Sequence, residues 1–113
     1  MRPLILLSND DGYQAQGINA LIESLRPLAD LLVVAPDGPR SGNSGAITSL
    51  LPLYNRLVSR SEATDTLGSV EVYACSGTPV DCVKMAFNIL LPRLGRTPAL
   101  MASGINHGDN SSV

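Results

Sequence analysis

The chain has 113 residues, of which 44% are hydrophobic, 16% charged and 4% aromatic, and its formal net charge is −2. This length and composition predict a single domain over residues 1–113 and exclude intrinsic disorder, collagen and low-complexity sequence. The near-neutral charge argues against binding to a nucleic-acid duplex. No apolar run reaches the roughly 20 residues of a membrane span, and acidic residues soon after the first apolar run leave no room for a signal peptide. We therefore expect a cytoplasmic protein, in which Cys75 and Cys82 are reduced core thiols.

The first half of the chain predicts a strand, a helix, a second strand and a loop. Residues 4–7 form a continuous apolar run, typical of a strand that is buried on both faces, and the polar stretch 8–17 follows. Residues 31–35 predict a second buried strand, and residues 37–48 predict a long loop. Between the strands, apolar residues with the spacing of one helix face predict an amphipathic helix that frays or ends near Pro27, namely Ile18, Leu21, Ile22, Leu25 and Leu28.

The second half continues the alternation. Residues 50–60 suggest an irregular strand, residues 61–69 a surface turn, and Val70–Cys75 a third clear strand. A helix is predicted to begin at Thr78 and Pro79, because threonine caps a helix and proline suits its first position. Residues 99–102 predict a last short strand, which opens into the polar stretch 103–110. Within the second helix the residues that keep helical spacing as far as Pro92 are Val80, Val83, Phe87, Leu90 and Leu91.

This order of elements predicts an α/β fold, with a mostly parallel sheet covered by helices on both faces. In such sheets ligands bind beyond the carboxyl ends of the strands. Three polar loops, residues 8–17, 36–48 and 103–110, fall at that edge. We therefore expect the chemistry of the protein there.

Asp10 and Asp11, which come shortly after the first predicted strand, are the sharpest chemical signal. Adjacent carboxylates repel each other at a partly desolvated edge, and a hard divalent cation removes that conflict. Gly12 supplies the backbone freedom to turn both side chains toward one point. A purely structural interpretation stays open, in which Asp10 caps the turn and Asp11 is solvated.

The two other loops offer neutral oxygen and nitrogen donors. The loop 36–48 contains Ser41, Ser44 and a single cation, Arg40, a combination that suits an oxyanion such as phosphate or, equally, an ordinary surface loop. The loop 103–110 contains Asn106 and the only histidine, His107. His107 could act as an acid or base near neutral pH, or simply be exposed.

Four segments resemble, in order and spacing, the successive signatures of the SurE family, the survival-protein-E nucleotidases: LLSNDDGYQAQGINAL, VVAPDGPRSGNSGAIT, GTPVDCV and SGINHGDN. The resemblance implies a Rossmann-like three-layer α/β/α sandwich, assembled as a homodimer or homotetramer. It implies a divalent-metal-dependent phosphatase that releases phosphate from nucleoside 5′- or 3′-monophosphates. It also implies that the family domain continues beyond the SGIN loop, so that the chain corresponds to its N-terminal part.

The same resemblance assigns roles to individual residues. The ligands of one Mg²⁺ or Mn²⁺ ion would be Asp10, Asp11, Ser41 and Asn106, and the two aspartates would also be the catalytic residues. Positions near the phosphate would be Asn9, Ser44 and Gly104. Residues 42–47 depart from the family pattern, because they lack the usual polar residue after the second serine.

Other interpretations compete with an active nucleotidase. A signalling receiver domain also has an acid pair after its first strand, but it needs a lysine at the end of its fifth strand, and the only lysine here, Lys84, falls within a predicted helix. A dinucleotide-binding module needs a glycine-rich turn where Asp10 and Asp11 stand. Haloacid-dehalogenase phosphatases need two aspartates separated by one residue, whereas Asp10 and Asp11 are adjacent here, so this class is disfavoured. A truncated, inactive nucleotidase that still binds metal is a further alternative.

Overall fold

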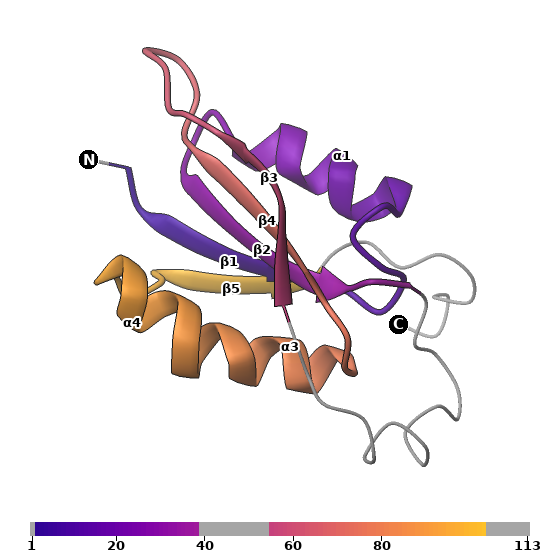
Figure 1. The fold of residues 1–113 in the computed structure, drawn as a ribbon. Helices are drawn as coiled ribbons and strands as arrows, with labels where there is room; N and C mark the ends of the chain where they lie inside the picture. The colour runs from indigo at the N-terminus through magenta and orange to yellow at the C-terminus, as the bar shows by residue number, and fades with distance from the viewer. Residues whose placement is uncertain (1, 39–54, 104–113) are drawn as a thin grey trace.

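The computed structural model describes residues 2–38 and 55–103, which form a central sheet with helices on both faces (Figure 1). The strand order is β3-β4-β2-β1-β5, with α1 on one face and the α3–η1–α4 segment on the other. Four strands are parallel, and β3 alone pairs antiparallel with its neighbour β4. The predicted three-layer α/β fold is therefore confirmed. The elements are β1 (Leu4–Ser8), α1 (Gln16–Leu25), β2 (Asp30–Pro36), β3 (Asn55–Ser61), β4 (Val70–Cys75), α3 (Pro79–Met85), η1 (Ala86–Leu90), α4 (Leu91–Leu94) and β5 (Leu100–Ser103).

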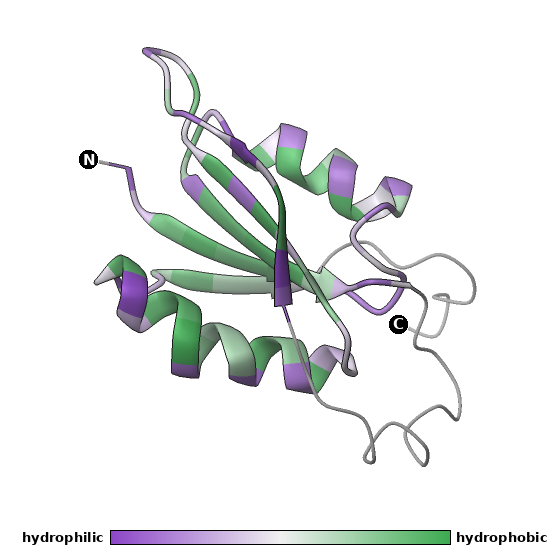
Figure 2. Cartoon of the chain, viewed as in Figure 1, coloured by the Kyte–Doolittle hydropathy of each residue, from purple (hydrophilic) through white to green (hydrophobic). Residues whose placement is uncertain are grey.

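The strands β1 and β2 form the centre of the core, and every residue of both is buried. Their side chains alternate between two apolar clusters: Leu6 and Val34 face the α3 side, whereas Leu7 and Val33 face the α1 side. Figure 2 shows both strands as nearly continuous hydrophobic bands. Each fully buried Leu or Val contributes about 1.5–3 kcal/mol. These runs fix the position of the polar loop that follows β1.

The helix α1 ends earlier than its apolar spacing suggests. It stops at Leu25, and the predicted face residue Leu28 lies beyond it with 66% of its surface exposed. Pro27 explains this end, as predicted, because it has no N–H to continue the helical hydrogen bonds, although Arg26 itself keeps helical dihedral angles (φ −56°, ψ −36°). Ile18 is fully buried against the sheet, as expected for the inner face.

The second helix continues past Pro92, contrary to the predicted end. The segment η1 is a π-helical turn, in which the N–H of Leu91 donates to the carbonyl of Ala86, and α4 then runs to Leu94. Pro92 falls in the first turn of α4, where a missing N–H is tolerated. Two residues of the predicted helical spacing are largely exposed: Val80, at the start of α3, is 63% exposed, and Phe87, within η1, is 46% exposed.

The two edge strands differ slightly from their predicted positions. The irregular strand predicted within residues 50–60 is β3, whose described part begins at Asn55 and whose pairing shifts register between Leu57 and Ser59. The strand β5 begins one residue later than predicted and pairs with β1. The described helices include none with the length and apolar character needed to cross a membrane.

A partly buried ion pair joins several segments at the amino end of the sheet. Asp30 accepts a 2.8 Å bond from Arg96 Nη1 and a 2.9 Å bond from the N–H of Ser69. Arg96 Nη2 also donates to the carbonyl of Arg2, at 2.8 Å. Burial alone would raise the pKa of Asp30, but the bond from Ser69 and the ion pair with Arg96 outweigh it and hold that pKa below its ordinary value.

Candidate active site at the carboxyl end of the sheet

The carboxyl ends of the parallel strands meet at one edge of the molecule. The strands β1, β2 and β5 end there at Ser8, Pro36 and Ser103, as shown by the parallel registers that pair them with one another. The acidic residues Asp10 and Asp11 follow β1 at this edge. The fold therefore places the predicted carboxylate pair where α/β proteins bind their ligands.

The turn after β1 is closed by the side chain of Asn9. Its Nδ2 donates to the carbonyl of Gly12 at 2.9 Å, and its Oδ1 accepts from the N–H of Gly12 at 3.1 Å. The side chain is 1% exposed, so these bonds lie within the protein. Asn9 thus holds the loop that carries Asp10 and Asp11. Its predicted contact with substrate stays a prediction.

Gly12 has a backbone φ of 106°, a conformation that side chains rarely allow. A Cβ atom there would lie 3.3 Å from the Cα of Gly38 and 3.5 Å from the carbonyl oxygen of Pro36. The next residue, Tyr13, donates its N–H to that same carbonyl at 3.0 Å. The loop after β1 is therefore packed directly against the segment after β2, and the predicted need for glycine is confirmed.

The two aspartates differ in exposure. Asp10 is exposed, whereas Asp11 is half-buried. Asp37 adds a third carboxylate at the same edge, after β2. Within residues 2–38 and 55–103, no group of three or more His, Cys, Asp or Glu side chains is close enough to hold a metal ion.

Several predicted site residues fall outside the described residues. These are the proposed metal ligands Ser41 and Asn106, the proposed phosphate neighbours Ser44 and Gly104, and His107. The structure therefore brings together Asn9, Asp10 and Asp11 and leaves the other assignments as predictions.

Ser8 is a residue of this edge that the sequence did not single out. Its side chain is buried, and its Oγ has no hydrogen-bond partner among the described residues. It lines a cavity of about 300 Å³ between α3 and β5, together with Asn9, Pro79, Val80, Val83, Lys84, Met101, Ala102 and Ser103. The sequence feature that could have identified Ser8 is its position as the polar last residue of an otherwise apolar strand.

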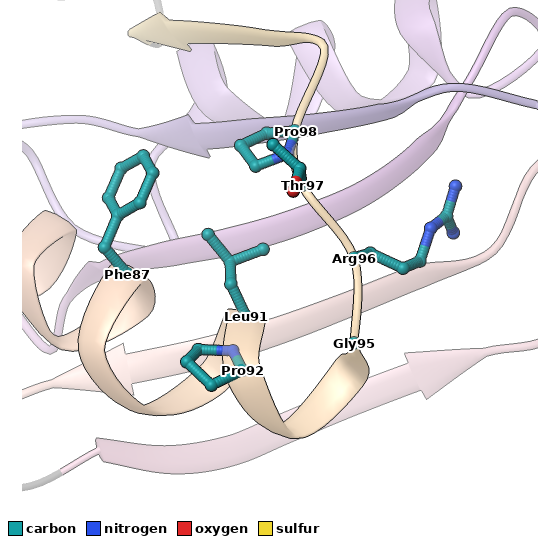
Figure 3. Close-up of a pocket in the computed structure, with 7 residues that line it drawn as sticks. All are labelled: Phe87, Leu91, Pro92, Gly95, Arg96, Thr97 and Pro98. Atoms are coloured by element: carbon teal, nitrogen blue, oxygen red, sulfur yellow. The ribbon is translucent and has the colours of Figure 1, made fainter.

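A second cavity, of about 360 Å³, lies beside the end of α4 (Figure 3). Phe87 and Leu91 point toward Pro98 there, whereas Arg96 points away from them. The guanidinium of Arg96 is bound to Asp30 and to the carbonyl of Arg2. No carboxylate lines the described part of this cavity, so it lacks the chemistry of the edge that carries Asp10.

The whole chain is similar to known proteins. The family model described as Survival protein SurE matches residues 5–113. A 5′-nucleotidase SurE of Phocaeicola vulgatus is 54% identical over 112 residues, which are 99% of this chain and 40% of that protein. A 5′-nucleotidase SurE of Porphyromonas gingivalis is 52% identical over 109 residues, which are 96% of this chain and 40% of that protein. The chain thus spans about 40% of the length of these curated relatives.

A solved structure agrees with the sequence comparisons. The crystal structure of the SurE protein of Aquifex aeolicus superposes with a TM-score of 0.68 at 41% identity, over 96% of this chain and 39% of that one. The fold and the sequence similarity along nearly the whole chain agree, and the chain belongs to the SurE family.

Proposed function

We propose that the chain forms the catalytic edge of a nucleotidase that hydrolyses nucleoside 5′-monophosphates to nucleoside and inorganic phosphate. The observation that carries the proposal is the Asp10–Asp11 pair, presented at the carboxyl end of a buried strand by the Asn9–Gly12 turn. Relatives at 54% and 52% identity that are named 5′-nucleotidase SurE support the substrate class. Nucleoside 3′-monophosphates are the second substrate class to be tested.

The donor set at this edge suits one hard divalent cation, Mg²⁺ or Mn²⁺. Both aspartates follow β1 after Asn9. Asp10 is exposed and Asp11 is half-buried, so carboxylate oxygens are available at the protein surface. Carboxylate, hydroxyl and amide oxygens are the ligands that such ions prefer. The proposed ligands are Asp10, Asp11, Ser41 and Asn106. When bound, the cation supplies charge neutralisation at the phosphate and a water of lowered pKa.

The residues of the chain have separate roles in this proposal. Asn9 and Gly12 fix the loop, so that the carboxylates keep one position relative to the sheet. Asp10 orients the attacking water and accepts its proton. The bond between phosphorus and the ester oxygen breaks, and this oxygen leaves with the bonding electron pair and takes up a proton from solvent to give the nucleoside. Ser44 and Gly104 contact the phosphate oxygens. This arrangement requires no cysteine or serine–histidine nucleophile.

The chain is proposed to be the N-terminal part of a longer nucleotidase domain that works as a homodimer or homotetramer. Its relatives are about two and a half times as long, since the matched residues are 40% of their length. A reducing compartment, the cytoplasm, suits two cysteines that are not disulfide-bonded.

The second candidate function is metal binding without turnover. The observation that favours it is the same 40% coverage, because residues beyond this length can be needed for catalysis in the relatives. Both candidates require the carboxylate pair. Only the first requires phosphate release.

The test compares phosphate release and manganese binding in three proteins. The chain is incubated with a panel of nucleoside monophosphates, with and without a chelator, and manganese affinity is measured by calorimetry. Asp10→Asn is expected to abolish phosphate release and to weaken manganese binding by at least about 10-fold. Asp65→Asn, an exposed aspartate in the turn between β3 and β4, is the matched control and should change neither.

The outcomes separate the candidates. Chelator-sensitive release that Asp10→Asn removes supports the nucleotidase. Manganese binding without release supports the inactive alternative. Phosphate release by Asp10→Asn at the wild-type rate would contradict the assigned role of Asp10.

A further inference from the structure

Cys75 and Cys82 form a pair of neighbouring thiols that the proposed function does not use. Cys75 is the last residue of β4, at the same edge of the sheet as the candidate active site, and Cys82 lies on the following helix, α3. Neither is disulfide-bonded, and neither has any exposed surface. Both belong to the same buried cluster on the α3 side of the sheet, and the Cys82 side chain lies within hydrogen-bond reach of Cys75. The two thiols are therefore neighbours in the folded protein.

The turn between the two cysteines is held firmly. Thr78 caps α3 by accepting a bond from the N–H of Asp81, and the carboxylate of Asp81 accepts bonds from both the N–H and the hydroxyl of Thr78. At Gly77 an added Cβ would lie 2.6 Å from the Cβ of Asp81, so the backbone and this side chain are in close contact. The orientation of α3 relative to β4 is therefore fixed, and with it the relative position of the two thiols.

The surroundings favour the thiolate form of Cys75. The hydrogen bond from Cys82 and a 3.4 Å bond from the N–H of Gly77 lower its pKa to about 7, against the opposing effects of burial and of the Asp81 and Asp37 carboxylates. The thiolate is the form of cysteine that attacks an oxidant. Cys75 is therefore the nucleophile of the pair, and Cys82 is the second thiol within its reach.

We propose that Cys75 and Cys82 are a redox pair, which hydrogen peroxide converts to an intramolecular disulfide between β4 and α3. The thiolate of Cys75 attacks one peroxide oxygen, the O–O bond breaks, and a sulfenic acid forms on Cys75 while hydroxide leaves and takes up a proton to become water. The sulfur of Cys82 then attacks the sulfur of Cys75, the S–O bond breaks, and the oxygen leaves as a second water. Two thiols lose two electrons in total, and one peroxide is reduced to two waters.

The burial of the pair selects the oxidant. Peroxide is about the size of two water molecules, whereas larger disulfides and alkylating reagents need an exposed sulfur. The cross-link would also reach the candidate site, because the carbonyl of Cys75 accepts a 2.9 Å bond from the N–H of Asp37, in the segment after β2. Oxidation would tie this segment to α3.

The test follows the fate of each cysteine. The folded chain is treated with hydrogen peroxide, the peroxide is removed with catalase, and the chain is unfolded and alkylated with N-ethylmaleimide before mass measurement and non-reducing peptide mapping. The expected product takes up no maleimide, runs as a monomer without reductant, and contains a Cys75–Cys82 peptide whose mass is lower by two hydrogen atoms. Peptide mapping separates this product from oxidation of the three methionines.

Two variants assign the order of the steps. Cys82→Ser should stop at the sulfenic acid on Cys75, which dimedone captures. Cys75→Ser should slow the oxidation of Cys82 by at least about 10-fold, because Cys75 provides the reactive thiolate. Circular dichroism shows whether each variant is folded, and the wild-type result decides the proposal without them.

Three results would overturn the proposal. The first is that both cysteines still take up maleimide after excess peroxide. The second is a disulfide between two chains instead of within one. The third is a sulfinic acid on either cysteine of the wild-type chain without a cross-link.

Discussion

At the scale of single residues, the turn after β1 depends on one side chain and one missing side chain. Both polar atoms of the Asn9 amide are hydrogen-bonded to Gly12. Gly12 itself has a φ of 106° and packs against the segment after β2. The positions of Asp10 and Asp11 follow from these two residues. Changes at either one should therefore affect ligand binding without touching a carboxylate.

Replacing Gly12 with alanine tests this dependence. Gly12→Ala is expected to lower the free energy of unfolding by about 1–2 kcal/mol or more, because alanine disfavours a positive φ. The crowded contact with Gly38, at 3.3 Å, adds to this cost and should weaken manganese binding. Urea unfolding and calorimetry measure the two effects.

The chain provides a matched control for that substitution. Gly95 also has a positive φ, of 69°, but a Cβ there would meet no atom within 4 Å. Gly95→Ala should therefore show only the backbone cost, about 1 kcal/mol, and leave manganese affinity unchanged. Equal effects of the two substitutions on stability and on binding would mean that the packing of the two loops is unimportant.

Ser8 leads to a prediction in the opposite direction. Its hydroxyl is buried and has no hydrogen-bond partner within residues 2–38 and 55–103, and a buried group without a partner costs stability. Ser8→Ala is expected to raise the free energy of unfolding by about 1 kcal/mol. Urea unfolding measures the change, and a clear loss of stability would show that the hydroxyl is bonded after all.

The sequence identified some of these residues and missed others for a physical reason. Asp10, Asp11 and Gly12 are recognisable because their chemistry and their place shortly after an apolar run are local properties. Ser8 is not, since its burial depends on α3 and β5, which lie far along the chain and close around it only in the fold. Whether such a hydroxyl finds a hydrogen-bond partner is decided by three-dimensional packing.

At the scale of elements, the start of α3 is the clearest case of local control. Thr78 and Asp81 form a capping box, and Pro79 occupies the first turn, as the sequence predicts. Thr78→Ala should lower the free energy of unfolding by about 1 kcal/mol. The exposed Thr66, in the turn between β3 and β4, is the control, and Thr66→Ala should stay within about 0.5 kcal/mol of wild type.

Thermal or urea unfolding of the two threonine variants decides this prediction. An equal effect at both positions would mean that the cap contributes nothing measurable. The capping box also supports the turn between Cys75 and Cys82, so Thr78→Ala should slow disulfide formation by peroxide as well.

The elements show where local patterns stop being sufficient. Buried strands were predictable because both faces demand apolar residues, and β4 matches its prediction at both ends. The predicted end of the second helix at Pro92 is wrong, because the π-helical turn at η1 accommodates this proline and the helix continues to Leu94. The spacing of apolar residues assumes an α-helix throughout, so it could not anticipate which face a π turn exposes.

At the scale of the whole molecule, the ion pair of Asp30 and Arg96 joins the start of β1, the start of β2 and the approach to β5. Asp30 lies within the fold, and Arg96 reaches it from 66 residues away along the chain. Neither the pair nor the antiparallel direction of β3 is visible in a local pattern. Both depend on how distant segments meet.

This ion pair predicts a dependence of stability on pH. The pKa of Asp30 is lowered in the folded chain, so its contribution is complete above the unfolded pKa and is lost as the pH falls through the folded value. Asp30→Asn should cost about 2 kcal/mol at neutral pH, and this difference from wild type should shrink below about pH 4. Urea unfolding across this range measures it.

The control for the pH prediction is again Asp65→Asn. That exposed carboxylate has no side-chain ion pair among the described contacts, so the variant should follow the wild-type profile. A constant difference between Asp30→Asn and wild type down to low pH would contradict the role assigned to the Asp30 charge.

The closed turn at Asn9 also has a thermodynamic consequence for any ligand of Asp10 and Asp11. Because both polar atoms of the Asn9 amide are hydrogen-bonded to Gly12, the backbone beneath the carboxylates has little conformational entropy left to lose. Association at this edge should then owe its free energy mainly to the new contacts, with only a small penalty for ordering the loop.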